Sequence, residues 1–125
     1  MTKQALILFA HGARAASWAA PFERLRDLTR ARLPETRVEL AFLELMEPRL
    51  PEMVAEMATQ GIADVTVVPV FLGQGGHVLR DLPAMVEQLR VDFPAAHLNV
   101  VEAVGENASV LHAISDYCVG SLAPH

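Results

Sequence analysis

Four apolar runs alternate with four stretches of helical periodicity along this chain, and no other feature restricts the fold as strongly. The runs cover residues 5–10, 38–43, 64–72 and 98–104. The first has the unbroken apolar character of a strand buried on both faces. The resulting β-α-β-α-β-α-β-α order predicts a parallel sheet with helices on both faces and right-handed crossovers.

Capping residues and prolines predict where the helices begin. Ser17 is expected to cap the first helix, with Pro21 in its first turn. Asp81 is expected to cap the third helix, with Pro83 at its start, and Asn107 is expected to cap the fourth. The fourth helix carries an apolar stripe at helical spacing, formed by Val110, Leu111, Ile114 and Tyr117.

For four such strands the expected sheet order is 2-1-3-4, which is the order of a flavodoxin-like, three-layer α/β/α fold. Chain direction across the sheet reverses between strands 1 and 3, so their carboxyl ends form a ligand-binding crevice. His11 follows the first strand and His77 follows the third, so both are expected at this crevice. Glu44 ends the second strand and is expected at the same rim.

Length and composition indicate a single folded domain over residues 1–125, because 52% of the residues are hydrophobic and 20% are charged. A formal net charge of −5 argues against nucleic acid as a partner. Cys118 is the only cysteine, which excludes a disulfide framework. No apolar run reaches the ~20 residues of a membrane span, and no signal peptide is recognisable. We therefore expect a cytoplasmic protein with no membrane partner.

Glycines precede the second histidine, at positions 73, 75 and 76. Gly75 and Gly76 allow the backbone to approach a ligand closely, although an ordinary tight turn has the same composition. Two imidazoles and a carboxylate at one rim suit a divalent transition metal such as cobalt, iron, nickel or zinc. Neutral imidazole is also a base near neutral pH. The alternative is that His11 and His77 only cap strands or donate hydrogen bonds to loop carbonyls.

Two arginines lie close to these histidines in the sequence. Arg14 and Arg80 follow His11 and His77 by three residues each. If their loops face the crevice, both arginines can pair with carboxylates of a ligand. Otherwise they are solvated loop charges.

Several well-known site motifs are absent. The glycines at 73, 75 and 76 lack the Lys-Ser/Thr of a phosphate-binding loop, and no G-x-G-x-x-G follows the first strand. Ala10 stands where a histidine phosphatase has the arginine of its Arg-His-Gly motif, which disfavours phosphoryl transfer. No Ser or Cys occupies a nucleophile elbow.

A set of short segments, spread over nearly the whole chain, carries a family pattern. The segments are 8–14 (LFAHGAR), 18–22 (WAAPF), 41–44 (AFLE), Glu47-Pro48, 69–73 (PVFLG), 75–78 (GGHV) and 81–83 (DLP). Together they resemble the short CbiX-type sirohydrochlorin chelatases, a branch of the class II chelatase family with a flavodoxin-like sheet. The resemblance implies an enzyme, a lyase that inserts Co²⁺ or Fe²⁺ into the polycarboxylate tetrapyrrole sirohydrochlorin. It also implies a homodimer and no organic cofactor, with the divalent metal as a substrate.

By the same resemblance, His11 and His77 are the metal ligands and proton acceptors, and Glu44 is a weaker candidate for a third ligand or proton relay. Arg14, Gly75, Gly76 and Arg80 are the expected substrate-binding residues. Ala13 departs from the pattern, because a serine is common there.

The alternative function is a non-catalytic metal- or tetrapyrrole-binding module in the same crevice. Nitrogen and oxygen ligands do not discriminate Co²⁺ from Fe²⁺ or Ni²⁺, so the metal stays open, as does the choice between cobalamin and siroheme.

Overall fold

The protein folds around a four-stranded parallel sheet. The computed structural model describes residues 3–73 and 76–122, with the backbone alone for residues 76–80. The strands are β1 (Gln4–Ala10), β2 (Arg37–Phe42), β3 (Asp64–Pro69) and β4 (His97–Val100), in the order β2-β1-β3-β4. In the central register, Ile7 pairs with Glu39 on one side and with Val67 on the other. The predicted fold class and strand order are confirmed.

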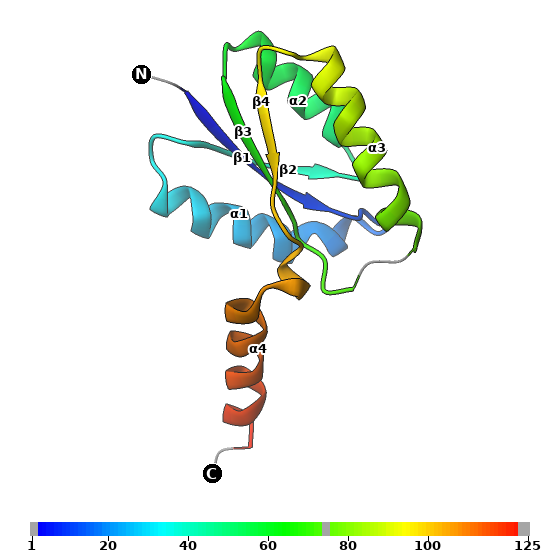
Figure 1. The fold of residues 1–125 in the computed structure, drawn as a ribbon. Coiled ribbons are helices and arrows are strands. Elements are labelled where there is room, and N and C mark those ends of the chain that lie inside the picture. The colour runs from blue at the N-terminus through cyan, green and yellow to red at the C-terminus, as the bar shows by residue number, and fades with distance from the viewer. Residues whose placement is uncertain (1–2, 74–75, 123–125) are drawn as a thin grey trace.

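Helices flank the sheet on both sides. These helices are α1 (Ala20–Arg32), α2 (Leu50–Thr59) and α3 (Gly76–Asp92). A fourth helix, α4 (Ala108–Gly120), follows β4, and short 3-10 turns lie at Ala16–Ala19 and Val104–Glu106. Figure 1 shows α1 on one side of the sheet and α2 and α3 on the other. None of the helices in the described ranges is long and apolar enough to span a bilayer.

The two faces of the sheet differ in how completely they are covered. Alternate residues of β1 point to opposite faces, so Ile7 and Phe9 enter one core while Leu8 enters the other. The larger core lies under α2 and α3 and includes Leu50, Met53, Val54, Met57, Leu82, Val86 and Leu89. The smaller core lies under α1, which buries none of its residues completely. The α1 side is therefore the less complete layer.

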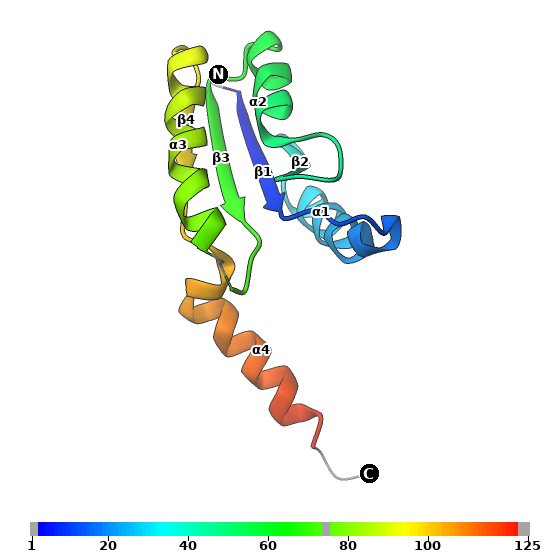
Figure 2. The same cartoon turned by 90° about the vertical axis from the view of Figure 1, so that its right-hand side faces the viewer.

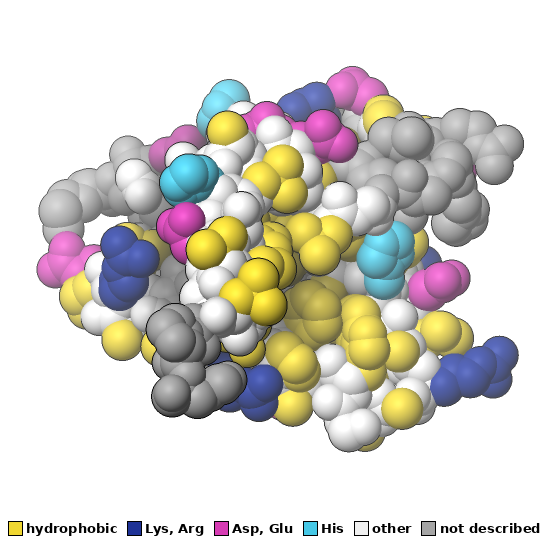
Figure 3. Space-filling model, turned by 90° about the horizontal axis from the view of Figure 1, so that it is seen from below, with side chains coloured by type: hydrophobic (Ala, Val, Ile, Leu, Met, Phe, Trp, Pro, Cys, Tyr) yellow, Lys and Arg dark blue, Asp and Glu magenta, His cyan; other side chains and the backbone are white. Residues whose placement is uncertain are grey.

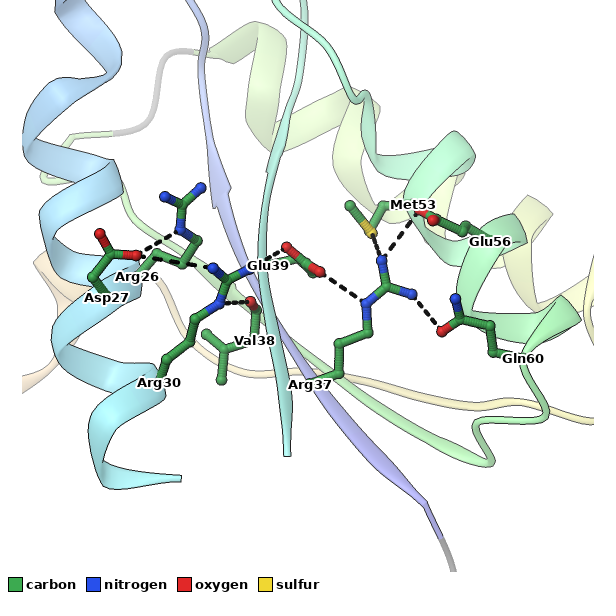
Figure 4. A network of polar contacts seen from close by, with 9 residues as sticks. All are labelled: Arg26, Asp27, Arg30, Arg37, Val38, Glu39, Met53, Glu56 and Gln60. Carbon is green, nitrogen blue, oxygen red and sulfur yellow. Dashed lines mark hydrogen bonds and ion pairs between the residues drawn. The ribbon is translucent and has the colours of Figure 1, made fainter. Parts of the chain in front are cut away.

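A network of charged side chains holds both α1 and α2 to the edge strand β2 (Figure 4). Glu39 accepts from Arg30 of α1 at 2.6 Å and from Arg37 at 2.8 Å. Arg37 also lies 3.3 Å from Glu56 of α2. Burial lowers the pKa of Arg37, but its hydrogen bonds and the charges of Glu39 and Glu56 outweigh this and raise it. In addition, the Nε of Arg30 donates to the backbone oxygen of Val38, a carbonyl of the edge strand.

Two predicted helix starts are wrong. Ser17 is not the cap of α1, because it lies inside the 3-10 turn, and Ala19 occupies the N-cap position without a side-chain bond. Asp81 does not begin α3, because that helix starts at Gly76 and contains Pro83. An internal proline removes one backbone donor, and the burial of Leu82 and Val86 against the sheet offsets this loss.

Two strands end earlier than their apolar runs. β3 stops at Pro69 rather than at residue 72, and β4 stops at Val100 rather than at residue 104. Val67 pairs with Val100, so a longer β4 would soon face Pro69, which has no N–H to donate. Pairing of β3 therefore ends at Pro69. The apolar residues beyond the two strand ends are left to build the carboxyl edge of the sheet.

The cap of the last helix is confirmed. The side-chain oxygen of Asn107 accepts from the backbone N–H of Val110 at 3.1 Å. The predicted apolar stripe is present as well, but it does not pack on the sheet: Leu111 and Ile114 are 46% and 40% exposed. Figures 1 and 2 both show α4 extending away from the rest of the molecule.

Candidate functional site

His11 is the first residue after β1, at the carboxyl edge of the sheet. Its ring is half-buried and lies against the ring of Phe71, with centroids 4.1 Å apart and planes 31° apart. Phe71 is 2% exposed and also contacts Phe9, with centroids 5.6 Å apart. The backbone joins these segments too, since Val70 N–H donates to the Phe9 carbonyl at 2.7 Å. A buried aromatic pair therefore supports the histidine ring from beneath.

Gly12 brings the ends of β1 and β2 into direct backbone contact. Its φ is +92°, a conformation that favours glycine. A Cβ at this position would lie 1.8 Å from the carbonyl oxygen of Glu44. The N–H of Glu44 in turn donates to the carbonyl of His11 at 3.1 Å. Glu44 therefore lies at the same rim as His11, as the sequence predicted, with its side chain exposed.

His77 is the second residue of α3, so it lies in a helix and not in the loop that the sequence predicted. Its side chain and that of Arg80, in the following turn, are outside what the structure describes. Gly76 is the first residue of the same helix, and Gly75 lies outside the described residues. The meeting of the two imidazoles across the crevice stays a prediction.

Arg14 lies in the exposed stretch between β1 and the first 3-10 turn. The next aromatic residue, Trp18, packs on Phe22 with ring centroids 4.5 Å apart. It also contacts Phe42 of β2 at 6.5 Å, so this segment is held to the edge of the sheet. Recognition of a carboxylate by Arg14 stays a prediction.

A third loop, after β4, closes onto the same edge. Gly105 N–H donates to the Phe71 carbonyl at 2.9 Å, and a Cβ on Gly105 would lie 1.9 Å from the Leu72 carbonyl oxygen. Sequence reasoning did not assign a role to Phe71 or Gly105. The alternation of side chains along a strand could have indicated the position of Phe71. It lies four residues after Val67 and therefore on the same face of the sheet.

Two exposed leucines lie at the same edge of the sheet as His11 and the aromatic pair beneath it. Leu45 and Leu72 follow β2 and β3 and are 57% and 65% exposed. Leu45 also has a φ of 68°, which costs about 1–2 kcal/mol in a residue with a side chain. Figure 3 looks at this end of the molecule with α4 pointing toward the viewer, and hydrophobic side chains lie across the middle of the view. The edge combines an imidazole with apolar surface, which suits a flat organic ligand that carries or accepts a metal.

The described side chains around His11 do not form a metal-binding cluster. Among the described side chains, which leave out that of His77, no three or more His, Cys, Asp or Glu residues gather closely enough to hold a metal ion. A pair of imidazoles would leave coordination positions open, which is what a transient metal site requires.

Comparison with known proteins gives a consistent result. The CbiX family model matches residues 5–118. A sirohydrochlorin cobaltochelatase of Methanopyrus kandleri is 35% identical over 82 residues, which are 66% of this chain and 57% of that protein. The chain thus spans little more than half the length of that curated relative.

Two solved structures share the fold. A putative cobalamin biosynthesis CbiX protein from Marinobacter aquaeolei is 34% identical, with a TM-score of 0.84 over 95% of this chain and 97% of that one. The sirohydrochlorin chelatase SirB from Bacillus subtilis, in complex with cobalt, is 23% identical, with a TM-score of 0.79 over 95% of this chain and 51% of that one. The second likeness concerns the fold alone. From the family match over residues 5–118, the chain belongs to the CbiX family.

Proposed function

We propose that this protein is a sirohydrochlorin chelatase, which inserts Co²⁺ or Fe²⁺ into the polycarboxylate tetrapyrrole. The observation that carries the proposal is His11, held on a buried aromatic pair at the open carboxyl edge between β1 and β3. The CbiX match and the name of the Methanopyrus relative support the same reaction. The metal is a substrate, and no organic cofactor takes part.

Metal insertion requires two events at one place. The solvated cation must lose part of its water shell, and two pyrrole N–H protons must leave the macrocycle. Imidazoles of His11 and His77 hold the cation with positions left open for the ring nitrogens. The same residues, or Glu44, accept the two protons as the metal enters. Charge balances because one dication replaces two protons, and no covalent bond to the protein forms.

The rest of the edge binds the macrocycle. Leu45 and Leu72 offer exposed apolar surface for the ring. Arg14 and Arg80 pair with its carboxylates, and Gly75 and Gly76 let the backbone approach it closely. The chain acts as a cytoplasmic homodimer, and the dimer places two such edges in one assembly.

The proposal is tested by following the absorbance of sirohydrochlorin with Co²⁺, Fe²⁺ and Ni²⁺ in turn. Multiple turnovers identify an enzyme, whereas a change that stops at one equivalent identifies a binding module. We expect His11→Ala to abolish insertion and to retain the wild-type circular dichroism spectrum. His112→Ala is the matched control, because His112 is 81% exposed on α4. Normal insertion by His11→Ala would remove the proposed site.

A further inference from the structure

The ring of His11 lies on the same face of the sheet as helix α3. Phe9 of β1 lies opposite Pro69 of β3, so two residues further along, His11 comes opposite Phe71. Phe9 and Phe71 both belong to the core under α2 and α3, and strand residues two positions apart share a face. The contact between the rings of His11 and Phe71 agrees with this placement. The imidazole is therefore on the side of the sheet that α3 covers, and α3 is the helix that carries His77.

The ring of Phe71 covers one face of the His11 imidazole. The two ring planes are 31° apart and the centroids are 4.1 Å apart, which is a stacked contact rather than an edge-on one. The contact of Phe71 with Phe9 is more tilted, at 57° and 5.6 Å. A stacked ring limits the rotation of its partner about the bond that joins the imidazole to the chain. Among the described residues, this stack is the contact that sets the plane of the imidazole.

Phe71 is itself held from several directions. Its side chain is 2% exposed, and the fully buried ring of Phe9 packs against it. The N–H of Val70, just before it, donates to the Phe9 carbonyl at 2.7 Å. Its own carbonyl accepts from the N–H of Gly105 at 2.9 Å. The backbone around Phe71 is thus tied both to β1 and to the loop after β4, so its ring is a rigid platform.

The plane of an imidazole matters because a metal ion binds along a nitrogen lone pair, and that lone pair lies in the ring plane. Groups outside the coordination shell usually fix this plane by a hydrogen bond to the second ring nitrogen. Losing such a group typically costs roughly 10- to 100-fold in metal affinity or activity. A ring stacked on the face fixes the same plane and blocks neither nitrogen.

We propose that Phe71 is a positioning residue for metal insertion, because it fixes the plane of the His11 imidazole and so aims the bound cation at the nitrogens of the macrocycle. The inference rests on the proposed function, since it concerns how His11 passes the metal on. Without the stack, the imidazole still binds the cation but holds it in many directions. Transfer requires a narrow range of geometries, whereas binding tolerates a wider one. Phe71 therefore acts mainly on kcat and little on the affinity for the tetrapyrrole.

Comparison of Phe71→Leu with Phe42→Leu tests this role. Phe42 is a matched control, because it is 5% exposed, ends the neighbouring strand and packs in the core on the opposite face. Urea unfolding is expected to show comparable losses of stability for the two variants. In the insertion of Co²⁺ into sirohydrochlorin, kcat of Phe71→Leu should fall about tenfold or more, with KM for the tetrapyrrole within about twofold of wild type. Phe42→Leu should keep kcat within about threefold.

Co²⁺ binding shows whether Phe71 acts through His11. Co²⁺ alone is titrated into the full chain, and the visible absorption of the bound ion reports its ligand geometry. Phe71→Leu should alter this spectrum, and Phe42→Leu should not. In a His11→Ala background, the addition of Phe71→Leu is expected to leave the Co²⁺ dissociation constant unchanged, because no imidazole is left to orient.

The wild-type protein offers a test that does not depend on a variant that folds. Because the two rings are stacked, the ring current of Phe71 should move the NMR signals of the His11 ring protons upfield. The reference is His112, whose side chain is 81% exposed on α4. His11 signals at the same position as those of His112 would overturn the stack, and with it the positioning role.

The outcomes separate this inference from the proposed function. Turnover by wild type together with an unchanged kcat in Phe71→Leu, or an equal fall in Phe42→Leu, would overturn the positioning role and leave the chelatase standing. No turnover by wild type would overturn the chelatase, and the Co²⁺ spectra would then decide the positioning role. A spectrum altered in Phe71→Leu alone supports it, and equal spectra in both variants overturn it. An effect of Phe71→Leu on Co²⁺ affinity that persists without His11 would also overturn it.

Discussion

The contact between Gly12 and Glu44 predicts a large loss of stability for Gly12→Ala. Alanine at φ +92° costs about 1–2 kcal/mol from backbone sterics alone. The new Cβ would also lie 1.8 Å from the Glu44 carbonyl oxygen, so the two segments must separate by more than an ångström. That movement weakens the Glu44 N–H bond to His11 and the Leu43 N–H bond to Ala10. Each bond contributes about 0.5–1.5 kcal/mol, which brings the expected loss to about 2–5 kcal/mol.

Two other glycines separate the two causes of this loss of stability, which are backbone strain and the collision of the new Cβ with a carbonyl oxygen. Gly61 has a φ of +74° with no atom within 4 Å of its Cβ position, so Gly61→Ala measures backbone strain alone. Gly105 meets the Leu72 carbonyl at 1.9 Å without a left-handed φ, so Gly105→Ala measures the collision alone. We expect Gly12→Ala to cost more than Gly61→Ala by at least the two lost hydrogen bonds.

The assay is urea unfolding at equilibrium, followed by circular dichroism, with the slope m checked for all variants. Co²⁺ binding measured on the same samples reports whether His11 has moved with the loop. If Gly12→Ala and Gly61→Ala lower the free energy of unfolding by amounts that agree within about 0.5 kcal/mol, the collision with Glu44 does not contribute to the loss and the reasoning is wrong.

Three further substitutions test other parts of the fold. Asn107→Ala removes the cap of α4 and is expected to cost about 1 kcal/mol, seen as faster amide exchange in the first turn of that helix; unchanged exchange there would contradict the capping bond. Glu39→Gln removes the carboxylate shared by Arg30 and Arg37, and should lower the unfolding free energy by about 1 kcal/mol at low salt and by less at high salt; a loss that does not depend on salt would speak against an ionic role. Ile7→Ala empties a fully buried position in the central strand and should cost about 2–5 kcal/mol in the same urea assay; a loss below 1 kcal/mol would mean that the core refills the space.

Much of the fold could be predicted because its signals are local. Unbroken apolar runs and helical periodicity identify strands and helices within short windows, and their alternation leaves few ways to order a parallel sheet. The placement of His11 and Glu44 at one rim followed from that order, since neighbouring parallel strands end at the same edge. The start of α3 was missed because Pro83 is a common first-turn residue, and only the burial of Leu82 and Val86 explains a helix that continues through it.

Other features depend on contacts between distant segments, so the tertiary structure alone decided them. The sequence by itself determined which strand residues point to which face of the sheet. It also determined that a histidine follows the first strand, at the edge where chain direction across the sheet reverses. It did not determine that Phe71 lies under that histidine, because the contact depends on where pairing of β3 ends at Pro69. Nor did it determine that α4 leaves its own sheet uncovered. That outcome comes from the close fit of Gly105 against Leu72, an interaction between backbone atoms more than thirty positions apart that no local pattern records.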